Sequence, residues 1–163
     1  MGSRISGKQI RDDSITGDDV DESTLVLKYF TTHKYTNTSG SDKKLIRFNA
    51  AGSDGTGGDQ VNNRFIPPAS GKIIKVLFRS TEATGNTEVA FLKISDGTEN
   101  FGSPGSPSSD VIINVSSANT VFAANFSNNN SFSSGDVLGI RINPTNNHGN
   151  VDITCVWEFD WSA

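Results

Sequence analysis

The first 25 residues place one aliphatic side chain at every fifth position, inside a ten-residue repeat that reads ISGKQIRDDS and then ITGDDVDEST. A step of five turns a helical side chain by roughly 140°, and an odd step on a strand sends it to the opposite face. Neither element would gather these side chains on one side of a lone segment. The five residues are Ile5, Ile10, Ile15, Val20 and Leu25.

These aliphatic side chains need a partner outside their own segment. Each gains roughly 1.5–3 kcal/mol on full burial, and a thin polar segment has no interior of its own. Gly7 and Gly17 follow two of them by two residues, where glycine can supply the positive φ of a regularly turning backbone. We therefore expect an extended stalk in which identical chains wrap about a common axis and stack aliphatic layers. Residues 1–25 would then serve oligomerisation and anchoring.

Two other interpretations of residues 1–25 stay open. Six acids oppose three basic residues here, a composition that is also typical of a disordered acidic tail. The acids could bind calcium, which takes about six to eight oxygen ligands, if three chains brought their carboxylates around one axis. A solvated acidic surface that complements a basic docking surface is the simpler expectation, so we assign no metal site and no cofactor. The acids are Asp12, Asp13, Asp18, Asp19, Asp21 and Glu22.

The rest of the chain has the composition of one folded domain. At 163 residues the sequence suits one domain plus an appendage, so we expect an attachment segment at residues 1–25 and a domain at residues 26–163. In that domain eleven basic and twelve acidic residues nearly balance, without the basic stripe that binds nucleic acid. No apolar run of about 18 residues predicts a membrane span, and no signal peptide opens the chain. We expect a protein that folds in the cytoplasm without membrane insertion.

From residue 25 onward the pattern changes to period-two alternation punctuated by Gly, Asn, Asp, Ser and Pro, which is typical of an all-β domain. Turn residues such as Gly97 and Gly135 separate the apolar runs, and Pro144 blocks another. The pattern predicts an antiparallel β-sandwich with a jelly-roll-like layout, with longer links at residues 51–58 and 100–109. We expect strands at residues 25–36, 45–50, 60–66, 72–81, 87–95, 110–115, 121–126, 136–143 and 151–161.

Two of these strands carry distinct signals. Residues 151–161 are apolar at every odd position and mostly polar at the even ones, so one face should meet the core and the other water or a neighbour. Residues 72–80 are apolar on both faces, which is typical of a central strand covered on both sides or of a strand in a subunit interface. Strict alternation places Ile74, Val76 and Phe78 on one side and Ile73 and Leu77 on the other.

Catalysis would need a nucleophile with a base, a pair of tuned carboxylates or a metal cluster, and the sequence offers none of these constellations. His33 and His148 are the only histidines, and we expect each to be a surface or hydrogen-bonded side chain. Cys155 is the single cysteine, so it cannot form an internal disulfide, and we expect a small buried hydrophobe. Because no catalytic motif occurs either, we do not expect an enzyme.

Several stretches resemble a known class of proteins. The sequence segments SGKQI from residue 6 and DSITGDDV from residue 13 resemble the N-terminal segments of many structural proteins of tailed bacteriophages, including fibres and capsid appendages. The stretches FIPPASGK at residues 65–72 and FSSGDVL at residues 132–138 look like strand-turn segments of the compact β-sandwich knobs on such proteins. Those knobs are similar in layout to C1q and TNF-like trimers.

The resemblance implies a homotrimeric knob on the virion surface, with residues 1–25 as the trimerisation segment that docks on other virion proteins. Because the chain is short for a complete host-binding tail fibre, we expect a capsid decoration protein or short head fibre first, and a tail-associated fibre or tip protein second. A module that binds a host glycan or receptor is a further alternative. Phe101 is the only aromatic residue that the predicted loop at residues 100–109 offers to such a ligand.

Overall fold

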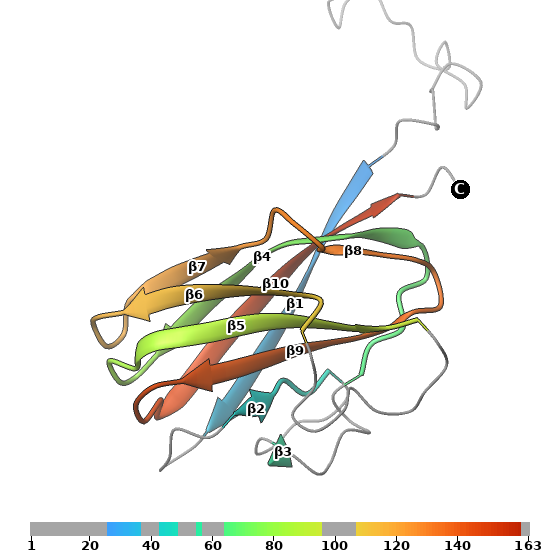
Figure 1. The fold of residues 1–163 in the computed structure, drawn as a ribbon. Helices are drawn as coiled ribbons and strands as arrows, with labels where there is room; N and C mark the ends of the chain where they lie inside the picture. Colours follow the sequence, from blue (N-terminus) through green and yellow to red (C-terminus); the bar gives the residue numbers. More distant parts are fainter. Residues whose placement is uncertain (1–25, 37–42, 49–54, 57–63, 96–106, 161–163) are drawn as a thin grey trace, which may run out of the picture.

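The computed structural model describes residues 26–36, 43–48, 55–56, 64–95 and 107–160. These ranges form a sandwich of two antiparallel sheets and contain no helix that could cross a membrane. Figure 1 views the sandwich from the side of β5, β6 and β9, with β1, β10 and β4 behind them. The strands of the described ranges are β1 Val26–Thr36, β2 Lys44–Leu45, β3 Gly55–Thr56, β4 Ser70–Ser80, β5 Gly85–Ile94, β6 Ser109–Val115, β7 Val121–Asn125, β8 Ser131–Phe132, β9 Val137–Pro144 and β10 Asn150–Asp160.

The strand order within the sheets is that of a jelly roll. One sheet, here called the β1 sheet, has the order β1-β10-β4-β7, with β8 also paired to β4; the other, the β9 sheet, has the order β3-β2-β9-β5-β6. When the short β3 and β8 are set aside, the first strand lies beside the eighth, and the eighth beside the third. The second strand lies beside the seventh in the other sheet, as two interlocked Greek keys require. The predicted jelly-roll sandwich is confirmed.

Most of the predicted strands are present within two residues of their expected limits. The exceptions are short elements that alternation signals poorly. The strand expected at residues 45–50 is wrong beyond Leu45, because β2 ends there and residues 46–48 are in no strand. β3 lies inside the predicted link at residues 51–58, and β8 lies between the strands expected at residues 121–126 and 136–143. Of the strand expected at residues 60–66 the structure describes only the end, where Phe65 forms an isolated bridge with Leu138. The predicted turn at Gly97 lies outside the described residues, whereas Gly135 has the expected positive φ of 84°.

β10 supplies the centre of the core, as its alternation predicts. Trp157 is fully buried, its ring packs against Phe91 and Phe132, and its indole Nε1 donates a hydrogen bond to Thr31 Oγ1 at 3.2 Å. A buried indole with a satisfied N–H stabilises the site where strands from both sheets meet. The buried odd-numbered residues of β10 are Val151, Ile153, Cys155, Trp157 and Phe159.

The predicted faces of β4 are wrong at Ile73 and Ile74, because a β-bulge changes the phase of the strand. For one step along β10, the partner residue on β4 changes by two, from Lys75 to Ile73. Ile74 is therefore the extra residue and is only partly buried. At the same point the other edge of β4 changes partner from β7 to β8. The buried face of β4 holds Ile73, Val76, Phe78 and Ser80.

Candidate self-association surface

The residues predicted for oligomerisation and anchoring lie outside the described residues. These are Ile5, Ile10, Ile15, Val20 and Leu25, and the six acids between them are outside as well. The first described residue is Val26, at the start of β1. The surface around this strand is therefore the part of the domain that residues 1–25 join.

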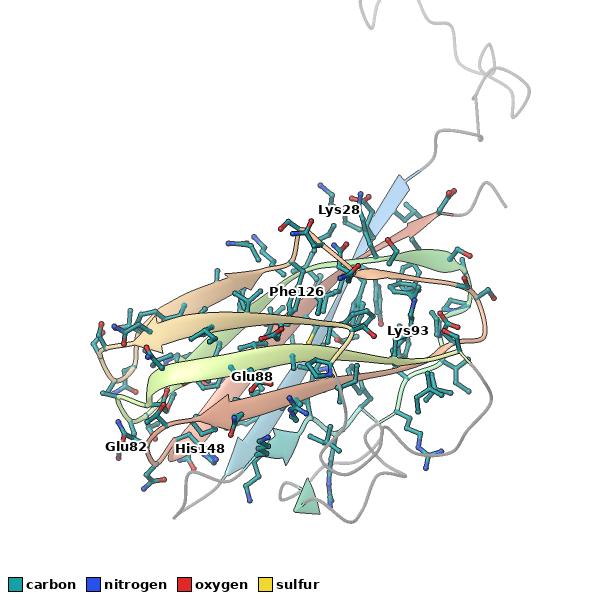
Figure 2. All side chains as sticks on the ribbon, in the orientation of Figure 1. Lys28, Glu82, Glu88, Lys93, Phe126 and His148 are labelled. Atoms are coloured by element: carbon teal, nitrogen blue, oxygen red, sulfur yellow. The ribbon has the colours of Figure 1, made fainter. Side chains whose placement is uncertain are left out.

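The beginning of β1 exposes several large apolar side chains. Of the six exposed large apolar side chains among the described residues, Leu27, Tyr29 and Phe30 lie within the first five positions of this strand. Figure 2 shows Lys28, between them, at the end of the sandwich opposite His148. Single exposed apolar residues are ordinary, but several of them beside a predicted oligomerisation segment make this end of β1 a candidate contact surface. β1 also lies at the edge of its sheet, with no partner on its far side in the described part of the chain.

Leu27 and Tyr29 lie on the inner side of the β1 sheet, because their partners on β10, Phe159 and Trp157, are buried. They remain exposed because the facing edge of the β9 sheet is too short to cover them. β1 has eleven residues, whereas β2 and β3 have two each. The result is a half-open apolar groove of about 360 Å³, lined by Leu27, Lys28, Tyr29, Phe65, Pro68 and Phe159.

The outer face of the β1 sheet has a charged row at each end and an apolar middle. Directly paired residues of neighbouring strands share a face, so the register defines these rows. One end row contains Lys28, Glu158 and Lys72, and the other contains Lys34, Asp152, Arg79 and Val121. The middle rows contain Phe30, Val156, Lys75 and Asn125, and Thr32, Thr154, Leu77 and Ala123. Each of these side chains is partly or fully exposed.

This outer face carries more positive than negative charge. With the row beyond Lys28, which pairs Val26, Asp160 and Ser70, the face holds five basic and three acidic side chains, an excess of two positive charges. Lys28 and Lys75 have no carboxylate partner within the described ranges. Most of the other charged groups form exposed ion pairs, each of which contributes about 0–1 kcal/mol after solvent screening. The pairs are Arg79 Nη1 with Asp152 Oδ2 at 2.7 Å, Lys34 Nζ with Asp152 Oδ1 at 3.8 Å, and Lys72 Nζ with Glu158 Oε1 at 2.7 Å.

The outer face of the β9 sheet, in contrast, is largely closed over β5 and β9. Ala90 and Leu92 alternate with the core residues of β5 and are nevertheless fully buried. Leu92 belongs to a second, smaller apolar cluster with Ile94, against which Leu45 and Val137 pack. β5 is therefore covered on both sides over residues 90–92, which was one of the two alternatives that the sequence offered for β4.

A buried ion pair lies beside that cluster. Arg141 on β9 donates a hydrogen bond to Glu88 on β5, which Figure 2 labels, and Asn143 Nδ2 donates to the second carboxylate oxygen at 3.2 Å. Burial by itself raises the pKa of Glu88. The hydrogen bonds from Arg141 and Asn143 and the positive charges of Arg141 and Lys43 outweigh that effect, so the pKa lies below its ordinary value. The pair joins two central strands and is sheltered from water.

His33 is a structural residue in this arrangement. Its Nδ1 donates to the carbonyl oxygen of Arg47 at 2.9 Å, and the edge of its ring meets Phe48 with 4.6 Å between centroids. Nε2 is buried without a hydrogen-bond partner. Burial lowers the pKa of His33, and the hydrogen bond to the Arg47 carbonyl opposes this only in part. These contacts with Arg47 and Phe48 cover the inner side of β1 at His33, beyond the apolar groove.

The other two residues considered for chemistry are also buried. Cys155 is fully buried, and desolvation raises the pKa of its thiol to about 12, although a hydrogen bond with Thr31 acts in the other direction. The prediction of a small buried hydrophobe is confirmed. His148 is fully buried in the connection between β9 and β10, where its backbone carbonyl accepts a hydrogen bond from Ser80 Oγ. In the described part of the chain no three His, Cys, Asp or Glu side chains gather as metal ligands.

The exposed apolar cluster on β1 is a feature that the sequence analysis does not single out. Its signal is present, because residues 25–30 contain apolar side chains at both odd and even positions. A strand with apolar side chains on both faces needs cover on both sides. At the end of an edge strand, that cover has to come from elsewhere.

No known family model matches the chain, and no curated protein matches it. One solved structure with a similar chain is the virus-like particle of the extra small virus of the giant freshwater prawn Macrobrachium rosenbergii. The sequence identity is 11% and the TM-score is 0.33, over 83% of this chain and 79% of that chain. A likeness of this degree says nothing about function. The jelly roll is assigned here from the strand order alone.

Proposed function

We propose that this chain is a structural protein of a tailed bacteriophage virion, a trimeric surface appendage that serves as a capsid decoration protein or short head fibre. Residues 1–25 join the copies and anchor them to other virion proteins, and residues 26–163 form the projecting knob. The observation that carries the proposal is the exposed cluster of Leu27, Tyr29 and Phe30, which directly follows the aliphatic repeat. The resemblance of the N-terminal segments to those of phage structural proteins supports the assignment to a virion. The proposal includes no catalytic activity and no cofactor.

Association of three copies gives a partner to the aliphatic repeat in residues 1–25 and to the exposed apolar cluster on β1. Burial of one aliphatic side chain contributes roughly 1.5–3 kcal/mol, and five such residues recur in each chain before the exposed cluster begins. Association costs on the order of 4–15 kcal/mol in lost translational and rotational freedom, which burial on this scale offsets. Ordering of residues 1–25 and trimerisation are then one event, because neither supplies the apolar contacts without the other.

The described core of the knob spans both sheets. Among the described residues, all members of the main buried cluster lie between Ile46 and Phe159. A chain that begins at residue 26 therefore keeps the contacts that hold the sandwich together. Removal of the segment changes the assembly and leaves the fold in place.

The proposal is tested by the mass in solution of the full chain and of residues 26–163, measured by light scattering after size exclusion. We expect three copies for the full chain and one copy for the shortened chain, which should keep its β-sheet circular dichroism. A full chain that is a single copy, and whose first 25 residues remain protease-labile on intact particles, would contradict the proposal.

The location on the virion separates the first proposal from its runner-up, a tail-associated fibre, tip or receptor-binding protein. Antibodies against the knob, viewed on intact particles by electron microscopy, should label the capsid. Label at the tail would favour the runner-up. In that case a glycan array provides the next test, because specific binding that is lost in Phe101→Ala would assign a host glycan to the predicted loop at residues 100–109.

A further inference from the structure

We infer that the outer face of the β1 sheet is the docking site for residues 1–25 of a second copy of this chain. The inference rests on the proposed oligomer and specifies one of its contacts. Between two predominantly basic rows the face offers apolar side chains, among which Lys75, Asn125 and two threonines also lie. The segment offers aliphatic residues with acids between them. The two surfaces have opposite charges, and both have apolar side chains that a partner can cover.

The charges of the two partners are opposite and of similar size. The outer face carries five basic and three acidic side chains, an excess of two positive charges. Residues 1–25 carry six acidic and three basic side chains, an excess of three negative charges. The remaining chain is nearly neutral, so these are local charges. At physiological ionic strength charges attract over about 8 Å, which directs the acidic segment to this face rather than to the largely closed β9 sheet.

The apolar parts of the two partners also correspond in their dimensions. Four strands span three gaps of about 4.8 Å, or roughly 14 Å, and five residues of extended chain span roughly 17 Å. Successive aliphatic residues of a segment laid across the strands can therefore contact opposite margins of the apolar middle. That middle contains Phe30 on β1, Val156 on β10 and Leu77 on β4. Gly7 and Gly17 allow the turns that bring successive aliphatic residues to the same side.

The direction of β1 favours the segment of a neighbouring copy over the chain's own segment. The chain enters the sheet at Val26, in the end row that precedes Lys28, so a segment that continued the direction of β1 would leave the face. Residues 18–25 contain neither glycine nor proline, and in extended form they would span about 26 Å. At that distance the segment would reach a neighbouring copy of the proposed trimer. Direct contact between the outer faces of two copies is disfavoured, because both carry excess positive charge.

Photo-crosslinking of the full chain tests the inference. A benzophenone amino acid replaces Leu77, and ¹⁵N-labelled and unlabelled chains are refolded together and irradiated. We expect crosslinks from position 77 to peptides within residues 5–22, about half of them between heavy and light chains. The matched control carries the same group at Ile112, which is 66% exposed on the outer face of the β9 sheet, and should give no such crosslinks.

The outcomes separate this inference from the proposed function. A trimer whose crosslinks from position 77 join light to light and heavy to heavy only would show that each chain's own segment covers the face. A trimer with crosslinks to other surfaces, or with none, would also overturn the inference while leaving the proposed function in place. A single-copy mass for the full chain would instead remove the proposed function itself.

Charge reversal supplies a second, independent readout. Lys28→Glu with Lys75→Glu breaks no ion pair within the described ranges and should weaken the association of full chains by about tenfold or more at low salt, with a smaller effect at high salt. Asp12→Lys with Asp13→Lys in the same chain should restore most of the loss. The control Asn114→Glu with Ser116→Glu adds negative charge at two exposed positions at the end of β6, in the other sheet, and should have little effect. Equal weakening by both pairs would contradict the inference.

Discussion

The outer faces of the two sheets carry the same kinds of side chain but differ in how far these are covered. On the β9 sheet Leu92 is fully buried, and the side chains of Arg141 and Glu88 are 6% and 22% exposed. On the β1 sheet Leu77 is only partly buried, and the side chains of Arg79 and Asp152 are 38% and 45% exposed. A leucine and a cross-strand ion pair are thus present on both faces, one set sheltered and the other accessible.

This difference shows which sheet serves stability and which is free for contacts. Burial sets the energetic weight of a side chain, because apolar area contributes only when it leaves water and ion pairs are screened where water remains. The β9 sheet gains from both of its faces within one copy. The β1 sheet gains from its inner face only, and its outer face retains apolar area and charge that a partner can use.

The largest expected effect comes from the matched leucines. Leu92→Ala in residues 26–163 should lower the free energy of unfolding by about 3 kcal/mol, because it leaves a cavity in a buried cluster. Leu77→Ala should lower it by less than about 1 kcal/mol in the same background, because Leu77 loses little burial. Urea unfolding followed by tryptophan fluorescence measures both. Equal losses would show that the two outer faces do not differ.

The matched ion pairs should differ in the same direction. Arg141→Met leaves the Glu88 carboxylate sheltered without its main cation and should cost about 2–3 kcal/mol of unfolding free energy. Asp152→Asn removes the corresponding exposed partner of Arg79 and should cost less than about 1 kcal/mol. The same urea titrations apply. A larger loss for Asp152→Asn than for Arg141→Met would reverse the comparison.

Acid should destabilise the domain through both His33 and Glu88. The folded-state pKa of each group lies below its ordinary value, so the unfolded state binds more protons and stability is lost as the pH falls. The His33 contribution is lost below about pH 6.5 and the Glu88 contribution below about pH 4.3. His33→Gln should flatten the first decline and Glu88→Gln the second. Stability that rises as the pH falls from 7 to 6 would contradict the assignment for His33.

The sequence allowed prediction of the features that depend on local pattern. Alternation in residues 151–161 correctly indicated the buried face of β10 as far as Phe159, and the turn residue Gly135 has its expected conformation. The bulge at Ile74 was missed because it depends on where β7 and β8 exchange places along β4, a pairing that local alternation does not encode. Correct residue types on β4 were therefore assigned to the wrong faces.

The candidate surface was only half predictable for a similar reason. The aliphatic repeat in residues 1–25 is visible in the sequence as a pattern that needs a partner. The exposure of Leu27 and Tyr29 follows from the shortness of β2, which lies in the opposite sheet. The charge of the outer face likewise becomes apparent only when the register aligns β1, β10 and β4. Both are properties of the assembled sandwich.

The most direct test of the central claim, that the β1 end of the knob and the repeat hold the copies together, is the sedimentation mass of two matched variants of the full chain. Phe30 and Ile112 are 65% and 66% exposed on different sheets, so replacing either with serine costs the isolated knob equally little. We predict a single-copy mass for Phe30→Ser at micromolar concentration and a three-copy mass for Ile112→Ser. Identical masses for the two variants would contradict the account.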